Sequence, residues 1–217
     1  MRGLDVSHWQ GDINWAKAKV GYSFAFTKCT QGVSFLDSKY TQNKKGIRES
    51  GLLFGAYHFA NADGDPVKEA DWFVKNVGDL KEGEIVVLDY ETYALPNPAE
   101  WCRKWLDRVE SKLGFKPLLY TYHGLLTKYN WKLVSDANFG LWAARYGMQT
   151  TWPNPLFKPS TGSWPFYAIW QYCSRGTVNG IAGNVDLNTT DMSLEVLRKY
   201  GKPKTEECTH CLIHCPK

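Results

Sequence analysis

Several features that define other protein classes are missing from this 217-residue sequence. It has no run of about 18 apolar residues, so it predicts no membrane-spanning helix. Its first residues, MRGLDVSHWQG, lack the apolar segment of a signal peptide. The net charge is only +4, and lysine and arginine form no block of the kind that nucleic-acid-binding surfaces need. These absences argue against an integral membrane protein and against a nucleic-acid-binding protein.

Cysteine is sparse in most of the chain. Cys29, Cys102 and Cys173 stand apart from one another beside apolar or aromatic residues, so we expect reduced cysteines in the core. The other three cysteines fall in the last ten residues, ahead of which a polar stretch, GKPKTEE (201–207), reads as a linker. We therefore expect one domain over residues 1–200 and a separate tail over residues 201–217.

The tail has features of its own. Cys208 and Cys211 have the C-x-x-C spacing of a zinc site or a redox pair. Further possible ligands lie close by in sequence: His210, His214 and Cys215. A bound metal, a disulfide or intermolecular link, and a functionally silent tail are all compatible with this pattern, and we predict no metal or cofactor for the function of the domain.

Eight apolar segments have the composition of β-strands. They lie at residues 2–8, 22–30, 52–60, 84–91, 116–122, 139–146, 166–172 and 183–188. The segments that begin at residues 52, 84 and 116 are almost continuously apolar. That pattern is typical of parallel strands covered on both faces.

Helices are predicted between the earlier strands, at residues 37–50, 66–77 and 97–113. The second opens with Pro66 at a first helical position, and the third stops at Gly114. Beyond residue 140 the helical patterns end, and segment 147–165 holds four prolines, as a long loop would.

This order of segments predicts an α/β fold. Alternation of strands and helices up to about residue 130 indicates a parallel sheet with right-handed crossovers. We therefore predict an incomplete TIM-like barrel of seven or eight strands, with its later helices missing. An open doubly wound sheet is the alternative, but no Gly-rich phosphate loop follows any strand.

Polar and aromatic residues gather at the expected ends of these strands. In a parallel barrel, the carboxyl ends of the strands carry the functional residues. The acids at these positions are Asp5, Asp89, Glu91 and Asp186, and the other candidates are Lys28, Tyr57, Tyr120, Trp142, Trp170 and Gln171. Aromatic residues make up 15% of the chain, which is enough for some rings to line a binding surface while most fill the core.

The segment EIVVLDYETY (84–93) runs from an apolar strand into two acids. Residues i and i+2 of a strand face the same side, so Asp89 and Glu91 should lie about 6–7 Å apart at Cβ in the barrel mouth. Two such carboxyl groups in a low dielectric raise one pKa, which suits the acid that glycoside hydrolysis requires. The structural alternative is a solvated strand end or a helix-capping cluster. A divalent metal site is a further alternative, but it would need a third ligand.

Eight short motifs together resemble the family-25 glycoside hydrolases, lysozymes that act as 1,4-β-N-acetylmuramidases. The motifs occur in the family's order from residue 3 to about residue 190: GLDVSHWQGDINW, FAFTKCTQG, GAYHFA, VVLDYE, LLYTY, LWAARY, AIWQY and VDLN. The resemblance implies a barrel of five β/α units followed by three strands. It also implies cleavage of the bond between N-acetylmuramic acid and N-acetylglucosamine in peptidoglycan.

The resemblance implies residue roles as well. Glu91 corresponds to the family's acid, Asp89 to its partner carboxylate, and Asp5 and Asp186 to two acids at the floor of the groove. The aromatic residues at sugar-contacting positions are Tyr57, Tyr120, Trp142 and Trp170, and we add Lys28 and Gln171 to the expected substrate-binding residues.

The sequence departs from the family pattern at two positions. Gln31 stands where the family often has Glu, which removes one negative charge near Lys28, and we expect activity to survive this change. Tyr90 stands where a small β-branched residue is common, and by alternation it should point away from the mouth.

Two other functions fit parts of the pattern. A chitinase of the D-x-D-x-E type would need Asp at the position of Val87. A non-catalytic wall-binding module is disfavoured because all four acids are present. Retaining, inverting and substrate-assisted mechanisms stay open at this level.

The expected partner is bacterial peptidoglycan, and the expected state is a monomer. Without a leader, the protein fits a phage endolysin released from the host cytoplasm; a secreted lysozyme whose leader was removed is the alternative.

Overall fold

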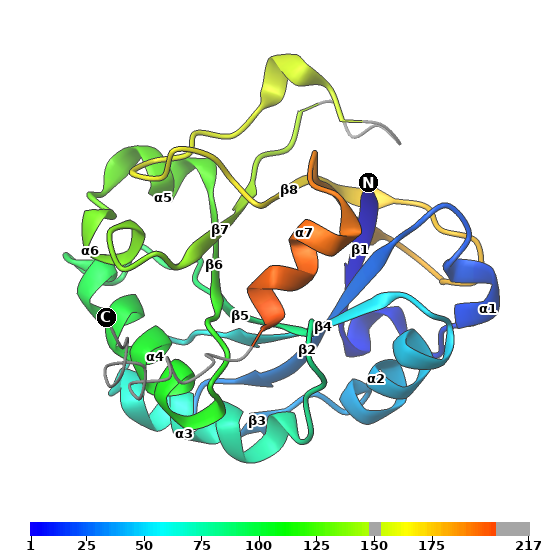
Figure 1. Cartoon of the computed structure of the whole chain (residues 1–217), viewed down its shortest axis with the longest axis horizontal. Helices are drawn as coiled ribbons and strands as arrows, with labels where there is room; N and C mark the ends of the chain where they lie inside the picture. The colour runs from blue at the N-terminus through cyan, green and yellow to red at the C-terminus, as the bar shows by residue number, and fades with distance from the viewer. Residues whose placement is uncertain (148–152, 203–217) are drawn as a thin grey trace, which may run out of the picture.

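The computed structural model describes residues 1–147 and 153–202. Its strands form one sheet in the order β1-β9-β8-β7-β6-β5-β4-β2-β3. The sheet closes into a barrel because β1 (Arg2–Val6) pairs with both β9 (Val185–Thr189) and β2 (Phe24–Gln31). The short strand β3 (Phe35–Leu36) only extends β2 as a hairpin, so eight strands make the barrel (Figure 1).

The remaining barrel strands lie close to the predicted segments. They are β4 (Leu53–Phe59), β5 (Ile85–Asp89), β6 (Leu118–Tyr122), β7 (Gly140–Ala144) and β8 (Ile169–Gly176). Neighbouring strands from β1 to β8 are parallel, whereas β9 runs antiparallel to both β8 and β1. The parallel sheet that the alternation up to about residue 130 predicted is therefore confirmed, and β9 is the barrel strand that reverses direction.

Helices cover the outside of the barrel only along its first five units. Each of these units contributes one or two helices: α1 (Trp15–Ala18), α2 (Tyr40–Glu49), α3 (Pro66–Val77), α4 (Pro98–Leu113), and the pair α5 (His123–Lys128) and α6 (Lys132–Ser135). In the described part after β7 there are only 3₁₀ turns, η2 (Pro155–Phe157) and η3 (Lys199–Gly201), and one short helix, α7 (Leu194–Arg198). The predicted α/β barrel with five β/α units is confirmed, and α7 was not predicted.

Local sequence signals explain the three long helices. The Asp65 side chain caps α3 by accepting from the Val67 N–H at 2.9 Å, and Pro66 takes the first helical position. Helix α4 ends where Gly114 adopts a left-handed conformation, with φ of 72°. These are the same signals that predicted both helices.

The barrel has two apolar cores because side chains alternate along each strand. On β5, Val86 and Leu88 point outward against the helices, and Ile85 and Val87 point inward. The next inward position is Asp89, so the inner core ends in a carboxyl group at the carboxyl end of the strand. This alternation explains why a buried strand ends in an acid.

Helix α7 closes the amino-terminal end of the barrel. It crosses the barrel on the side nearest the viewer in Figure 1, and Leu197 joins the inner core. Just after it, the Gly201 carbonyl accepts from the Gly83 N–H at 2.7 Å, and a Cβ on Gly201 would lie 2.2 Å from the Glu84 carbonyl oxygen. Only the opposite end of the barrel is left for a substrate.

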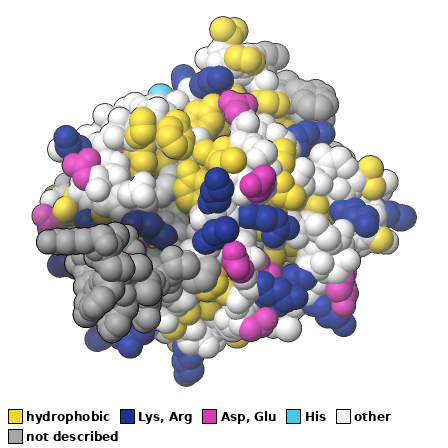
Figure 2. Space-filling model, viewed as in Figure 1, with side chains coloured by type: hydrophobic (Ala, Val, Ile, Leu, Met, Phe, Trp, Pro, Cys, Tyr) yellow, Lys and Arg dark blue, Asp and Glu magenta, His cyan; other side chains and the backbone are white. Residues whose placement is uncertain are grey.

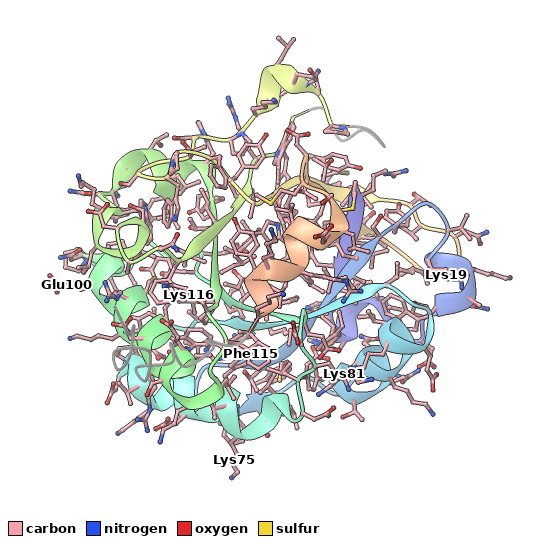
Figure 3. All side chains as sticks on the ribbon, viewed as in Figure 1. Lys19, Lys75, Lys81, Glu100, Phe115 and Lys116 are labelled. Carbon is pink, nitrogen blue, oxygen red and sulfur yellow. The ribbon has the colours of Figure 1, made fainter. Side chains whose placement is uncertain are left out.

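The closed end has no surface of a single charge. Lys81 and Lys116, which precede β5 and β6, are labelled near α7 in Figure 3. Figure 2 shows Lys and Arg interspersed with Asp and Glu over this face. In residues 1–147 and 153–202, none of the helices combines the length and apolar character needed to cross a membrane.

Candidate active site

A cavity of about 290 Å³ opens at the carboxyl ends of the parallel strands. Its lining comes from every barrel strand or the residues just beyond it: Asp5, Val6, Ser7, Trp9, Gln10, Lys28, Tyr57, Phe59, Asp89, Glu91, Tyr120, Trp142, Tyr146, Gln171 and Asp186. The structure thus brings together all of the residues proposed from the sequence except Trp170.

Asp89 and Glu91 form the centre of this site. Asp89 is the last residue of β5 and is buried, whereas Glu91 lies two residues beyond the strand and is exposed. Between them Tyr90 points outward, where it is fully buried between Trp101 and Trp131, as alternation predicted. The two carboxyl groups are therefore presented to one cavity from adjacent positions.

The two carboxyl groups share a hydrogen bond. Burial raises the pKa of Asp89 well above its ordinary value, and the negative charges of Glu91 and Asp5 raise it further. Burial also raises the pKa of Glu91, while hydrogen bonds from Asp89 and Tyr120 and the charge of Lys28 oppose that rise. Both shifts favour the protonated form of the carboxyl group, and the two groups titrate as a pair.

Asp5 and Asp186 face each other across neighbouring strands. They are register partners on β1 and β9. Because β9 is antiparallel, its amino-terminal end lies at the cavity, and this explains how a residue near the start of a strand reaches the same rim. Burial raises the pKa of Asp5 to about 6 and that of Asp186 to about 9, and the charge of Glu91 adds to both.

Amide side chains hold Asp5 in place. Its Oδ2 accepts from Gln171 Nε2 at 2.8 Å and from Asn188 Nδ2 at 2.7 Å. Gln171 Oε1 in turn accepts from the hydroxyl groups of Tyr120 at 2.7 Å and Tyr146 at 2.5 Å. The orientation of one acid is thus linked to two tyrosines in the cavity wall.

Among the residues of the site that sequence reasoning missed are Asn188, Tyr146 and Trp9. Asn188 also accepts from Trp142 Nε1 at 2.8 Å, and Tyr146 and Trp9 line the cavity. Asn188 and Tyr146 were detectable, since Asn188 follows Asp186 by two positions on one strand and Tyr146 stands at a strand end. Trp9 was not detectable in this way, because it lies in a 3₁₀ turn after β1, η1 (His8–Gln10).

Lys28 is the only cation among the described residues that line the cavity. Its ammonium group donates to Gln31 Oε1 at 2.5 Å and lies 4.7 Å from the centre of the Phe59 ring. Burial lowers the pKa of Lys28, while the charges of Asp89, Asp37 and Glu91 oppose that change. Because its partner Gln31 is neutral, the positive charge stays available to the carboxyl pair.

The prediction that Trp170 contacts the substrate in the groove is wrong. Trp170 is buried on the outer side of β8, where its Nε1 donates to the Arg145 carbonyl at 3.0 Å and its ring contacts Tyr167 and Tyr172. The inward position belongs to its neighbour Gln171, because alternation allows only one of two successive residues to face the cavity. Trp142 does face inward and lies at the floor of the cavity.

The three scattered cysteines lie in the core. Cys29, Cys102 and Cys173 are buried, and none of them is in a disulfide, as expected. The Cys and His residues of the tail lie outside the described residues. Within residues 1–147 and 153–202, no three His, Cys, Asp or Glu side chains converge in an arrangement suited to a metal ion.

Known proteins share both the sequence pattern and the fold. The family model described as glycosyl hydrolases family 25 matches residues 4–181. A lysozyme of Streptomyces globisporus is 30% identical over 208 residues, which cover 87% of this chain and 67% of the relative. A bacterial lysozyme structure from Streptomyces coelicolor covers 93% of this chain and 96% of its own, at 28% identity and a TM-score of 0.78. The structure of the catalytic domain of an endolysin from a Listeria monocytogenes bacteriophage covers 93% of this chain and 97% of its own, at 29% identity and a TM-score of 0.74.

Proposed function

This chain belongs to family 25 of the glycosyl hydrolases, and from that membership we propose that it hydrolyses bacterial peptidoglycan at the β-1,4 bond between N-acetylmuramic acid and N-acetylglucosamine. It is a glycoside hydrolase with a barrel fold. The observation that carries the proposal is the set of four carboxyl groups around one cavity, in which Asp89 and Glu91 interact and burial raises the pKa of both.

We assign the general acid to Glu91. The leaving oxygen approaches from the open side of the cavity, where Glu91 is exposed and Asp89 is buried. The elevated pKa of Glu91 supports this role, because a carboxyl group must still be protonated near neutral pH to donate to the glycosidic oxygen.

We assign to Asp89 the orientation of the substrate's acetamido group. Its Oδ1 is buried and has no hydrogen-bond partner among the described residues, so a donor from the substrate would satisfy it. The N–H of the N-acetyl group is such a donor. The side-chain interaction between Asp89 and Glu91 favours this role over that of a base in an inverting pair, whose carboxyl groups lie about 6.5–9.5 Å apart to hold a water.

The proposed reaction has two steps. Glu91 gives its proton to the glycosidic oxygen while the acetamido oxygen bonds to the anomeric carbon and the bond to the leaving sugar breaks. Asp89 stabilises the positive charge that develops on the acetamido nitrogen. Glu91, now ionised, then removes a proton from a water that attacks the anomeric carbon, and this restores both the acetamido group and the acid.

The test is release of reducing ends from purified peptidoglycan. We expect Glu91→Gln and Asp89→Asn each to lower the rate at least about 100-fold without loss of folding, the scale of general acid catalysis. Glu195→Gln is the matched control, because Glu195 is exposed on α7 at the closed end of the barrel. A Glu91→Gln variant within a few-fold of the wild type would remove Glu91 from the mechanism.

We further propose that the protein acts on the wall as a monomer and reaches it as a phage endolysin does. An endolysin catalytic domain is among the similar structures. Size-exclusion chromatography with light scattering should give one chain of 24.8 kDa. A dimer would contradict the first statement. The second would fail if the protein were found in the medium of intact producing cells.

A further inference from the structure

A cluster of aromatic side chains lies next to the cavity, on the segments that follow β5 and β6. We call it the rim platform; it consists of Tyr93, Tyr122, Tyr129 and Lys128. The Tyr93 ring is 49% exposed and lies 5.9 Å from the Tyr122 ring and 6.5 Å from the Tyr129 ring, centre to centre. An aromatic surface that stays half exposed is available to a ligand.

The rim platform continues the wall of the cavity. Tyr120 lines the cavity, and Tyr122 follows it by two positions at the end of the same strand, so both lie on one face. Tyr93 follows Glu91 by two residues in the loop after β5, and its ring contacts that of Tyr122. Burial raises the pKa of Tyr122, and contact with Tyr93 and the charge of Glu91 add to the rise, so all three groups lie close together.

Gly124 helps to hold the platform together. A Cβ at this position would lie 2.7 Å from the Tyr93 hydroxyl oxygen and 3.0 Å from the Tyr122 ring. The absence of a side chain therefore lets the exposed tyrosine pack against the start of α5. The platform is a packed surface and does not depend on a chance side-chain orientation.

Lys128 places a positive charge over this surface. Its ammonium group lies 4.6 Å from the centre of the Tyr93 ring and 5.2 Å from that of Tyr129. None of the ion pairs recorded within residues 1–147 and 153–202 involves Lys128, and the residue is exposed. An aromatic face beside an uncompensated cation suits a sugar ring that carries an anionic group.

We propose that the rim platform is a substrate subsite for a sugar with a carboxylate-bearing substituent, which in peptidoglycan is the peptide-substituted N-acetylmuramic acid. Tyr93 lies under the sugar ring, and Lys128 pairs with a carboxylate of the attached peptide. N-acetylglucosamine carries no charge, so the subsite distinguishes the two alternating sugars. This inference rests on the proposed function. It adds the residues that determine which sugar of the glycan chain lies at which position of the site.

The position of Glu91 indicates which part of the strand occupies the platform. Glu91 lines the cavity, Tyr93 follows it by two residues outside that lining, and as the acid Glu91 contacts the leaving oxygen. The rim platform therefore binds the part of the glycan strand that leaves, at the sugar next to the one whose oxygen receives the proton from Glu91. Binding a muramic acid unit there places the bond between N-acetylmuramic acid and N-acetylglucosamine over the carboxyl pair.

The experiment compares two substrates with Lys128→Met. One is peptidoglycan freed of teichoic acids, and the other is the same material after carbodiimide coupling to methylamine has converted its free carboxylates to neutral amides. We expect kcat/KM to fall about threefold to tenfold more on the strands with free carboxylates, mainly through KM, which is the scale of one partly exposed ion pair. The difference should disappear at about 0.5 M salt, because screening weakens exposed pairs. Lys128→Arg keeps the positive charge and should therefore restore the wild-type kcat/KM.

Controls separate binding from folding. Lys132→Met, on the neighbouring helix α6, should behave as the wild type because Lys132 is exposed and lies outside the platform. Tyr93→Ala should weaken binding of both substrates, since stacking needs no charge. Equal losses for Lys128→Met on both substrates, or a loss that follows a lower melting temperature, would show that Lys128 only supports the loop and would overturn the inference.

Two further outcomes are also decisive. A defect that appears only on walls with teichoic acids would make a phosphate the partner and would refute the carboxylate assignment. A wild-type protein that releases no reducing ends refutes the proposed function instead, whereas an active wild type with an unaffected Lys128→Met refutes the subsite alone.

Discussion

Replacing Asp5 with asparagine should stabilise the folded protein above about pH 6 while it impairs the enzyme. Asp5 is buried, and burial raises its pKa from the ordinary 3.8 to about 6. Folding therefore favours the protonated acid and opposes the ionised one. The wild-type fold carries no penalty from Asp5 below about pH 4, and it carries the full penalty once the pH exceeds about 6.

The size of the penalty follows from the two pKa values. A rise from 3.8 to about 6 corresponds to about 3 kcal/mol that the ionised group costs the folded state. Asparagine keeps an oxygen that can accept from Gln171 and Asn188, so the hydrogen bonds to the strand survive. For a protein of this length, about 3 kcal/mol corresponds to a rise of about 6–12 °C in Tm.

The assay is denaturant unfolding of the Asp5→Asn variant and the wild type between pH 4 and pH 8. The free energy of unfolding should be nearly equal at pH 4 and should differ by about 2–3 kcal/mol at pH 8, with the variant more stable. Its kcat should fall about tenfold, because the charge that tunes the Asp89–Glu91 pair is lost. A difference that does not depend on pH, or a variant less stable at pH 8, would refute the reasoning.

Two further predictions concern packing and the end of the chain. Trp170→Ala should cost about 3–5 kcal/mol of stability and leave KM nearly unchanged, whereas Trp9→Ala, at a side chain 81% exposed beside the cavity, should raise KM and leave Tm unchanged. Calorimetry and steady-state kinetics on peptidoglycan measure the two effects. The opposite pattern would contradict the placement of both residues. Truncation after Lys202 should leave activity on purified peptidoglycan intact, because the cavity residues precede position 187 and Gly201 keeps its contact with Gly83. A truncated protein that is folded but inactive would assign the tail a part in catalysis.

The sequence predicted those parts of the fold that local patterns determine. The apolar runs located all eight barrel strands, and caps such as Pro66 and Gly114 located the long helices. Helix α7 was missed although Ser193 caps it and Glu195 lies in its first turn. The segment is only five residues long, and tertiary contacts such as that of Leu197 with the inner core stabilise it.

The candidate site was predictable where alternation on a strand could be counted. Asp89 and Glu91 follow from the pattern of β5, and Tyr90 points outward as expected. Trp170 was misplaced because the inward face of β8 depends on its register with β7, which no local pattern determines. The contact of Asn188 with Asp5 joins the two ends of the barrel sequence through antiparallel β9, so it emerges only in three dimensions.

Mass spectrometry of digested peptidoglycan tests the central claim most directly. The products are reduced with borohydride, which marks the sugar that carries each new reducing end. The account predicts that reduced N-acetylmuramic acid carries the label in wild-type digests, and that Glu91→Gln digests lack these products. Reduced N-acetylglucosamine at the new ends, or cleavage only within the peptides, would contradict it.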